Sequence, residues 1–444
     1  MSVIEQQFAE YCTQRLSGAR EGIDTVNLPV SGVLTKVTGQ LLEAKGCVTR
    51  NGEVCRIETL GAGLVDAVVI GCDEQKISLM TIDNADMQPG ARVTPAGHGL
   101  RCPMGYGLLG RVIDSRGDPM DNLGPLTDTE PGTLEPRQIN PLDRVPIDTP
   151  LDVGVRAINA LITIGRGQRI GLFAPSGLGK SVLLGMMTRH TNADITVVCL
   201  LGERGREVRE FVQQILGPDG MKQSVVIAIP ADHTSLRRLN GAKYATAVAE
   251  YFRDRGHQVL LLMDSLTRYA QAGREIGLAA GELPVAHGYP PTVFTDLPVL
   301  LERGGSTSAG SVTAVYTLLL ENDDEDPLAE TAKAILDGHI VLSRELAESG
   351  HYPAIDVLSS TSRLRDAVIS AEHKQAVLML LQLYSCYRSN KDLISLGMYQ
   401  SGNDPLLDKA LELMPLISRF LTQESAEKID FDQCINELKQ LTGV

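Results

Sequence analysis

The sequence predicts an α/β protein built on a parallel sheet, with a small N-terminal β-barrel and a C-terminal helical domain. Three observations support this prediction. From about residue 98 to 375, apolar runs of strand length alternate with helical stretches, which is typical of a parallel sheet covered by helices on both faces. Residues 23–97 contain short β-rich runs that are broken by Gly, Asn and Asp. Residues 376–444 carry apolar residues at helical spacing.

The composition excludes two broad classes of protein. The chain has 444 residues, of which 43% are hydrophobic and 22% charged, so it can bury a core and is not wholly disordered. Its longest apolar runs have the length of strands, well short of the roughly 20 residues of a membrane-spanning helix. The first residues show no basic stretch followed by an apolar one, so no secretory signal is visible. We therefore expect the eight cysteines to be reduced thiols in a cytoplasmic protein.

Residues 1–22 have the pattern of one short amphipathic helix, because Ile4, Phe8 and Cys12 share a face. A helix of this length is marginal on its own and needs a surface to pack on. That surface is either its own domain or a partner protein, and the sequence supports the two interpretations equally.

The next region, residues 23–97, predicts a small barrel or sandwich. Regular short strands separated by turn residues are typical of such folds. The strands are expected at 32–37, 46–49, 54–57, 66–70 and 77–80. No residue pattern in this region points to catalysis.

Residues 98–375 form the predicted parallel sheet, and residues 376–444 form the predicted helical domain. Ligands of such sheets bind beyond the carboxyl ends of the strands, so the residues that follow each strand are the candidates for a site. The expected strands are 169–174, 195–201, 224–229, 259–263 and 311–320. The expected helices include 206–216, 241–255, 377–387 and 406–420, and the acidic run 321–326 is expected to be a solvated loop.

The segment from Ala174 to Ser181, APSGLGKS, matches a phosphate-binding P-loop. It follows a predicted strand and opens a predicted helix, so that the backbone N–H groups of the loop and the helix N-terminus face phosphate. Lys180 is expected to reach the β- and γ-phosphates of ATP, and the Ser181 hydroxyl to bind Mg²⁺. The residues expected to line the nucleotide are Pro175, Ser176, Gly177, Leu178, Gly179, Lys180, Ser181 and Val182.

Pro175 is unusual in a loop of this kind, because proline has no backbone N–H to donate. If the N–H group at this place normally faces phosphate, the loss of that donor lowers the affinity for nucleotide.

The run VLLLMD, which ends at Asp264, has the pattern of a Walker B strand. The carboxylate at the end of such a strand holds Mg²⁺ directly or through water. Many buried strands end in an aspartate that merely caps a helix. Because this one lies downstream of a P-loop, the metal-binding role is favoured.

The segment GERGRE, residues 202–207, follows the first predicted strand after the P-loop. Hydrolysis needs a carboxylate that orients and polarises the attacking water. Glu203 is the first acidic residue past the strand and would face the γ-phosphate, whereas Glu207, one helical turn later, is expected to pair with a local arginine. From the residues alone, a catalytic Glu203 and a solvated charge cluster are equally supported.

A second glycine-rich segment, GYGLLG at 105–110, matches the dinucleotide-binding pattern G-x-G-x-x-G. That pattern needs a strand before it and a helix after it. Here it leads into RVID, a strand-like run, and no helix opens. We therefore do not expect a nicotinamide or flavin site.

Several motifs together resemble the ATPases of flagellar and type III protein export, a family similar to the catalytic subunits of rotary ATP synthases. They are LLGRVIDSRGDPMD at 108–121, GVRAINALITIGRGQRIGLF at 154–173, GERGREVREF at 202–211, MDSLTRYAQAGREIGLAAGE at 263–282, GYPPTVF at 288–294 and LDGHIVLSRELAESGHYPAIDVLSSTSR at 336–363. The resemblance covers the chain from about residue 25, and DLISLGMYQSGNDPLLDKAL at 392–411 resembles the flagellar branch. It implies a P-loop NTPase core of RecA-like type.

The resemblance also implies roles that the spacing of residues does not give. It makes Glu203 the catalytic carboxylate and Arg204 a supporting charge nearby. It places Tyr352, in the segment GHYP, against the adenine ring of ATP. It makes Arg363 an arginine finger that reaches the site of the neighbouring subunit, where such residues accelerate phosphoryl transfer by on the order of 10³–10⁵.

Partners and location follow from the same resemblance. Members of the family are homohexameric rings with a central coiled-coil stalk subunit and a regulatory subunit that binds the N-terminal helix. They couple ATP hydrolysis to the release of export substrates from chaperones and their delivery to a membrane export gate. We expect a cytoplasmic protein, peripherally associated with the inner-membrane export apparatus through partners, since a net charge of −14 disfavours direct attachment to anionic lipid.

Three alternatives stay open at the level of sequence. The first is that the host machine is a virulence injectisome rather than a flagellum. The second is a nucleic-acid translocase, but residues 23–97 contain no Phe, Tyr or Trp on which bases would stack, so no nucleic-acid partner is expected. The third is a non-catalytic nucleotide-binding structural subunit, which would typically lack the carboxylate that Glu203 supplies.

Overall fold

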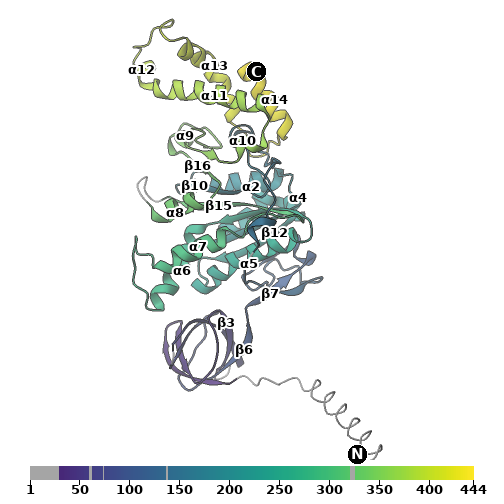
Figure 1. Ribbon diagram of the computed structural model, residues 1–444, viewed down its shortest axis with the longest axis vertical. Coiled ribbons are helices and arrows are strands. Elements are labelled where there is room, and N and C mark those ends of the chain that lie inside the picture. Colours follow the sequence, from purple (N-terminus) through teal and green to yellow (C-terminus); the bar gives the residue numbers. More distant parts are fainter. Residues whose placement is uncertain (1–29, 60–62, 74, 137–138, 321–325) are drawn as a thin grey trace, which may run out of the picture. The chain divides into compact units, whose positions relative to one another are not determined.

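A computed structural model of the protein describes residues 30–59, 63–73, 75–136, 139–320 and 326–444 (Figure 1). These residues divide into two compact units. The first contains the described residues up to Thr81 together with Ala85–His98, and the second contains those of Ile82–Asn84 and Gly99–Val444. The predicted helix at 1–22 lies outside the described residues.

The first unit is a closed barrel of six strands. Its strands are β1 (Gly32–Thr38), β2 (Leu41–Lys45), β3 (Glu53–Thr59), β4 (Gly63–Cys72), β5 (Ile77–Thr81) and β6 (Arg92–Gly99). They pair in the order β1-β2-β5-β4-β3-β6. Alternate side chains of each strand point inward and form the core of the barrel, among them Leu34, Leu42, Ile57, Val69, Leu79 and Val93.

One predicted strand of the barrel is wrong. Residues 46–49 form no strand, and the strand of this region is β2, five residues earlier. Leu42 and Ala44 of β2 are fully buried in alternation. Gly46 has φ 86°, a left-handed conformation that ends the strand there. The other four predicted strands of this region lie within β1, β3, β4 and β5.

The second unit is built on a nine-stranded, mostly parallel sheet. Its order is β17-β16-β10-β15-β13-β11-β12-β8, with β14 paired to β15. Only β14 and β17 run antiparallel to their neighbours. The strands are β8 (Val112–Ile113), β10 (Arg169–Ala174), β11 (Ile195–Glu203), β12 (Ser224–Pro230), β13 (Gln258–Asp264), β14 (Gly305–Ser306), β15 (Ser311–Leu319), β16 (Gly338–Val341) and β17 (Thr361–Ser362). The five strands predicted for this region all form.

Helices and irregular segments cover both faces of this sheet. The helices are α2 (Lys180–His190), α3 (Gly205–Glu210), η4 (Phe211–Leu216), α4 (Gly217–Lys222), α5 (Ser235–Arg253), α6 (Leu266–Ala279), α7 (Pro291–Leu301), α8 (Pro327–Ile335), α9 (Arg344–Glu348) and α10 (Arg365–Val368). A short β7 (Arg101–Met104) pairs with β9 (Glu130–Thr133), and η1 (Tyr106–Leu108), η2 (Pro141–Asp143) and η3 (Ile158–Ile162) are single turns. Asp326, the last residue of the acidic run, caps α8, and the rest of that run lies outside the described residues.

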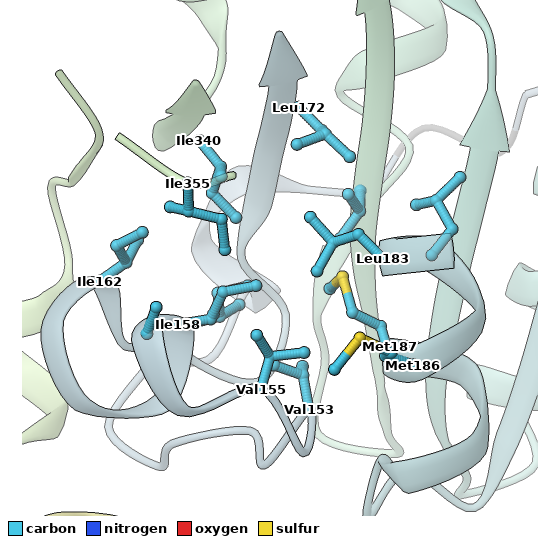
Figure 2. Packing of buried hydrophobic residues seen from close by; sticks show 14 of the residues in the cluster. Val153, Val155, Ile158, Ile162, Leu172, Leu183, Met186, Met187, Ile340 and Ile355 are labelled. Carbon is cyan, nitrogen blue, oxygen red and sulfur yellow. The ribbon is translucent and has the colours of Figure 1, made fainter. Parts of the chain in front are cut away.

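Neighbouring residues of the central strands alternate between two apolar cores, because successive side chains of a strand point to opposite faces. Leu172 of β10 joins one core and Phe173 the other. On the face of Leu172, the segment before β10 packs against the helix that follows β10 (Figure 2). The residues that meet there are Val153, Val155, Ile158, Ile162, Leu172, Leu183, Met186, Met187, Ile340 and Ile355.

The C-terminal part is helical, as predicted. It contains α11 (Ala371–Ser389), α12 (Lys391–Ser395), α13 (Pro405–Leu421) and α14 (Phe431–Thr442). Val377, Leu380, Ile417 and Leu438 of these helices join the same core as Leu172. The barrel, the mostly parallel sheet and these helices confirm the predicted fold class.

Two further observations concern the described residues as a whole. No helix among them is long and apolar enough to cross a membrane. The seven cysteines that they include are free thiols, and Cys12 lies outside the described part.

Candidate active site

The predicted P-loop lies between β10 and α2. Gly177 and Gly179 have φ of 84° and 83°, a left-handed conformation that side chains rarely adopt. Gly179 is the N-cap of α2 and supplies no side-chain cap, so the backbone N–H groups of the first turn are available to a ligand. A Cβ atom added to Gly177 would meet nothing within 4 Å. The loop is therefore an open cradle of backbone donors at the N-terminus of an 11-residue helix.

Three side chains that the sequence singled out meet beside this loop. The Nζ atom of Lys180 forms an ion pair with Asp264 and lies 3.9 Å from Oε1 of Glu203. The three residues belong to α2, β13 and β11, which are separate in sequence. Because the carboxyl ends of the parallel strands lie at the same edge of the sheet, the fold brings these residues together.

Asp264 is the buried charge of this cluster, with 2% of its surface exposed. Besides Lys180, it accepts a hydrogen bond of 2.8 Å from Oγ1 of Thr317 in β15. The parallel register of β13 and β15 places Thr317 beside Asp264, because Met263 pairs with Tyr316. The sequence analysis missed Thr317. In the sequence, Thr317 is only a hydroxyl residue near the carboxyl end of a predicted strand. Its contact with Asp264 could be predicted only by knowing that β15 lies next to β13.

The residues present fit a magnesium ion that arrives with nucleotide. Mg²⁺ prefers oxygen ligands and usually binds one or two protein groups, with phosphates and water completing its shell. The carboxylate of Asp264 and the hydroxyl of Ser181, an exposed residue on the first turn of α2, are oxygen groups of this chemical kind. Within the described part of the chain, no group of three His, Cys, Asp or Glu residues forms a metal cage by itself.

Glu203, at the end of β11, has a raised pKa. Burial, first of all, raises the pKa of Glu203 to about 7. The hydrogen bond with Glu207 and the negative charge of Asp264 also raise this pKa, whereas the positive charge of Lys180 lowers it. The pKa of Glu207 is lowered, first by that hydrogen bond. Glu203 is therefore poised to exchange a proton near neutral pH, as a general base requires.

Arg204 and Glu207 lie at the rim of the site. Their side chains are 3.6 Å apart, which confirms the expected pairing of Glu207 with a local arginine. The side chain of Arg204 is 80% exposed, so it faces solvent in a single chain. Next to them, the stem of Arg268 from α6 packs over Gly202, a contact that the sequence analysis did not foresee.

Tyr352 lies beside the P-loop although it follows it by more than 170 residues. Two atoms of its ring are 3.8 Å from the position that a Cβ atom on Gly179 would take. The side chain is 46% exposed, so one part of the ring remains open to a ligand. The structure thus brings the tyrosine expected to contact adenine to the loop expected to hold the phosphates.

Arg363 lies at the opposite end of the sheet. Its backbone N–H donates to the carbonyl of Asp337 at 2.9 Å, and the backbone N–H of Arg169, the first residue of β10, donates to the carboxylate of Asp337 at 3.0 Å. The P-loop follows the last residue of β10, so roughly 20 Å of strand separates the two ends. The structure therefore does not bring Arg363 to the active site of its own chain. The guanidinium of Arg363 is exposed and donates a hydrogen bond to the carbonyl of Lys333.

The segment GYGLLG has a different structure from the P-loop. It forms the turn η1 and runs into β8, as the strand-like residues after it predict. A Cβ atom on Gly107 would lie 1.6 Å from the carbonyl oxygen of Thr127, and one on Gly105 would lie 2.2 Å from that of Asp128. The glycines here allow two backbone segments to approach each other, which explains the motif without a dinucleotide.

The comparison with protein families gives two matches. Residues 154–362 match the model of the ATP synthase alpha/beta family, nucleotide-binding domain. Residues 369–440 match the model of the T3SS EscN ATPase C-terminal domain. The first match contains the residues of the site described above, and the second contains the C-terminal helices.

Individual relatives match almost the whole chain. The flagellum-specific ATP synthase of Salmonella typhimurium is 53% identical over 422 residues, which cover 92% of each chain. Among solved structures, the assembled ATPase EscN of the enteropathogenic E. coli type III secretion system is 41% identical, with a TM-score of 0.88 over 93% of this chain and 100% of that one. EscN in complex with its central stalk EscO is 40% identical, with a TM-score of 0.86 over the same shares.

Proposed function

The chain belongs to the family of flagellum-specific ATP synthases and type III secretion ATPases, and is an ATPase of that family; on this premise we propose that its hydrolysis of ATP powers or primes protein export by a flagellar apparatus. One observation carries the proposal. Lys180, Glu203 and Asp264 come from three separate elements and meet beside an open P-loop. A virulence secretion system is the second candidate host, because the ATPase EscN of such a system matches this chain with a TM-score of 0.88.

Each residue of the cluster has a task in phosphoryl transfer. Lys180 and the backbone N–H groups of 176–182 bind the phosphates. Asp264 and Ser181 hold Mg²⁺, which neutralises charge on the phosphates when it is bound. Glu203 orients the attacking water and accepts its proton, and the charge of Arg204 supports the site from the rim. Tyr352 stacks on the adenine ring.

Arg363 completes the site of a neighbouring subunit. Its distance from its own P-loop, and its exposed guanidinium, support a role in trans. Such a role requires a neighbouring subunit, and the similarity to the assembled ATPase EscN supports a homohexamer. The similarity to the complex of EscN with EscO supports a central coiled-coil stalk as a partner.

The remaining partners are proposed from the family alone. A regulatory subunit binds the helix at 1–22, and export chaperones deliver their substrates, which the ATPase releases to the membrane export gate. This activity locates the protein in the cytoplasm, at the periphery of the inner-membrane export apparatus. No nucleic acid takes part.

The test is specific ATPase activity as a function of protein concentration, for the wild type and for Arg363→Ala. We expect activity per mole to rise with concentration for the wild type and to stay low for the variant. Arg344→Ala, which removes an arginine elsewhere on the chain, is the control and should follow the wild type. A wild type whose activity is independent of concentration while it sizes as a monomer would contradict the role in trans.

A further inference from the structure

The residues that follow α13 are bonded to the segment that carries Tyr352. The backbone N–H of Gln423 donates to the carbonyl of Tyr352 at 2.9 Å. The hydroxyl of Thr422 lies 3.4 Å from Nδ1 of His351. The ring of Tyr352 is half exposed, so its position depends on how firmly its backbone is held.

The side chain of Gln423 is buried, with 4% of its surface exposed, and it uses both of its N–H groups. Nε2 donates to the carbonyl of Gly154 at 2.8 Å and to that of Glu427 at 3.0 Å. Oε1 accepts from the backbone N–H of Arg156 at 2.8 Å. These bonds fix residue 423 to the segment 154–156, which lies more than 260 residues earlier in the chain.

The segment 154–156 is in turn fixed to the helix of the P-loop. Val155 of this segment and the adjacent Val153 lie beside Met186 and Met187 of α2 in the apolar core (Figure 2). A Cβ atom on Gly154 would lie 2.1 Å from a side-chain carbon of His190, the last residue of α2, so the two backbones are in close contact. Gln423 therefore links Tyr352 to the same rigid core that positions the phosphate-binding loop.

We propose that Gln423 is a positioning residue for the base-binding side of the active site: it holds the backbone of Tyr352 so that the ring is placed for a purine base before nucleotide binds. This inference rests on the proposed function, in which Tyr352 stacks on adenine. Gln423 touches neither base nor phosphate and acts through Tyr352. Placing the ring in advance removes the ordering cost that the base would otherwise bear on binding.

The test separates the base from the phosphates, using two probes with the full-length protein: MgADP, and Mg pyrophosphate, which has no base. Dissociation constants are measured by calorimetry for the wild type and for Gln423→Met, which keeps the length of the side chain. We expect the affinity for MgADP to fall about 3- to 10-fold and the affinity for Mg pyrophosphate to stay unchanged. The loss for MgADP is smaller than the roughly 5- to 150-fold loss expected when a base–aromatic stack is removed altogether, because the ring of Tyr352 is still present. Gln433→Met, on the exposed face of α14, is the matched control and should leave both constants unchanged.

Tyr352→Ala, measured alongside, distinguishes the two ways of failing. If Tyr352→Ala leaves MgADP binding unchanged, the adenine assignment in the proposed function is wrong and the inference falls with it. If Tyr352→Ala loses MgADP affinity and Gln423→Met does not, the inference is overturned and the proposed function stands. If Gln423→Met loses affinity equally for MgADP and Mg pyrophosphate, the inference is also overturned. Such a result would mean that the substitution loosens the whole site, including its phosphate-binding part, and not only the side that binds the base.

A second variant covers the case in which Gln423→Met does not fold. Thr422→Val removes the hydroxyl that contacts His351 and leaves the buried amide in place. We expect a loss of about twofold in MgADP affinity with no loss for Mg pyrophosphate. Wild-type affinity for MgADP in that variant would overturn the inference.

Discussion

Two glycine-rich segments of the same compact unit, 105–110 and 174–181, differ in what surrounds their glycines. In the first, Gly105 and Gly107 face the backbone of residues 127–129 at distances that leave no room for a side chain. In the second, Gly177 faces open space, and the nearest neighbour of Gly179 is the half-exposed ring of Tyr352. The first pair of glycines serves packing within the chain, and the second pair leaves room for a ligand.

This difference teaches that glycine spacing alone does not identify a phosphate site. Both segments follow strands, and both match a nucleotide-binding pattern. What distinguishes them is the helix that α2 opens after the second segment, and the charged groups of Lys180, Glu203 and Asp264 beside it. The predictions below test whether function is confined to the open segment and its charges.

The largest effect is expected from Glu203→Gln. Loss of the carboxylate removes the group that polarises water, so turnover should fall roughly 10²- to 10⁴-fold while ADP still binds. Steady-state ATPase assays and ADP titration measure the two quantities. Glu210→Gln, on the exposed side of α3, is the control and should keep full turnover. A Glu203→Gln variant with near-normal turnover would exclude Glu203 as the catalytic base.

The comparison itself is tested by one substitution in each segment. Gly107→Ala places a Cβ atom 1.6 Å from the carbonyl oxygen of Thr127. It should destabilise the fold by about 1–3 kcal/mol or more, and leave the affinity of the folded fraction for ADP unchanged. Gly177→Ala should cost only about 1–2 kcal/mol of backbone strain but weaken ADP binding at least tenfold, because it fills the phosphate cradle. Thermal unfolding and ADP titration report both quantities.

The matched control for Gly177 is Gly124. It has φ of 83° and no atom within 4 Å of a Cβ position, so Gly124→Ala carries the same strain outside the site. Its melting temperature should fall as far as that of Gly177→Ala, with ADP binding intact. If Gly124→Ala weakened ADP binding equally, strain rather than a filled cradle would explain the loss, and the contrast between the two segments would fail.

The sequence predicted the central strands because burial on both faces makes them continuous apolar runs. It placed Asp264 because this residue ends such a run, and Lys180 because it belongs to a P-loop motif between a predicted strand and a predicted helix. Strand β2 and the role of Thr317 could not be predicted, because both depend on which strands pair in the folded chain. Strand β2 was missed because it is short and half polar, with inward residues only at Leu42 and Ala44. Thr317 meets Asp264 only through the order of the strands.

Neither Tyr352 nor Gln423 has a sequence pattern that marks its role. The family resemblance pointed to Tyr352, and only the contacts of the folded chain pointed to Gln423. Tyr352 lies in an irregular segment, and only the folded chain places its ring beside Gly179. Gln423 has no motif, because its role consists of three hydrogen bonds to Tyr352, Gly154 and Arg156, which lie far from it in sequence. Residues of this kind are found from contacts, since neither composition nor periodicity marks them.

The pH dependence of activity tests the charges beside the open loop. The pKa of Glu203 is raised to about 7, so below pH 7 its carboxyl group is protonated and cannot accept a proton from water. We expect kcat/KM to fall about tenfold per pH unit below pH 7 and to level off above it. Glu207→Gln removes a group that raises this pKa, so the fall should begin at a lower pH.

The control for this experiment is again Glu210→Gln, whose pH profile should match that of the wild type. A profile of Glu207→Gln that also matches the wild type would show that the contact between Glu203 and Glu207 does not set the protonation of the base. A wild-type profile that is flat from pH 6 to 8 would contradict the raised pKa itself.

The smallest effect is expected from Pro175→Ala, which adds one backbone donor to the open loop. Alanine restores a backbone N–H at a half-buried position next to the end of β10. If this N–H faces phosphate, the new hydrogen bond to a charged group should tighten ADP binding about threefold. This gain is smaller than the roughly 1.5–3 kcal/mol of such a bond, because alanine makes the unbound loop more flexible than proline does and this freedom is lost on binding. Calorimetric titration of both proteins measures the change. Unchanged affinity would mean that the loop binds phosphate through residues 176–182 alone, and that Pro175 takes the place of a donor that the site never used.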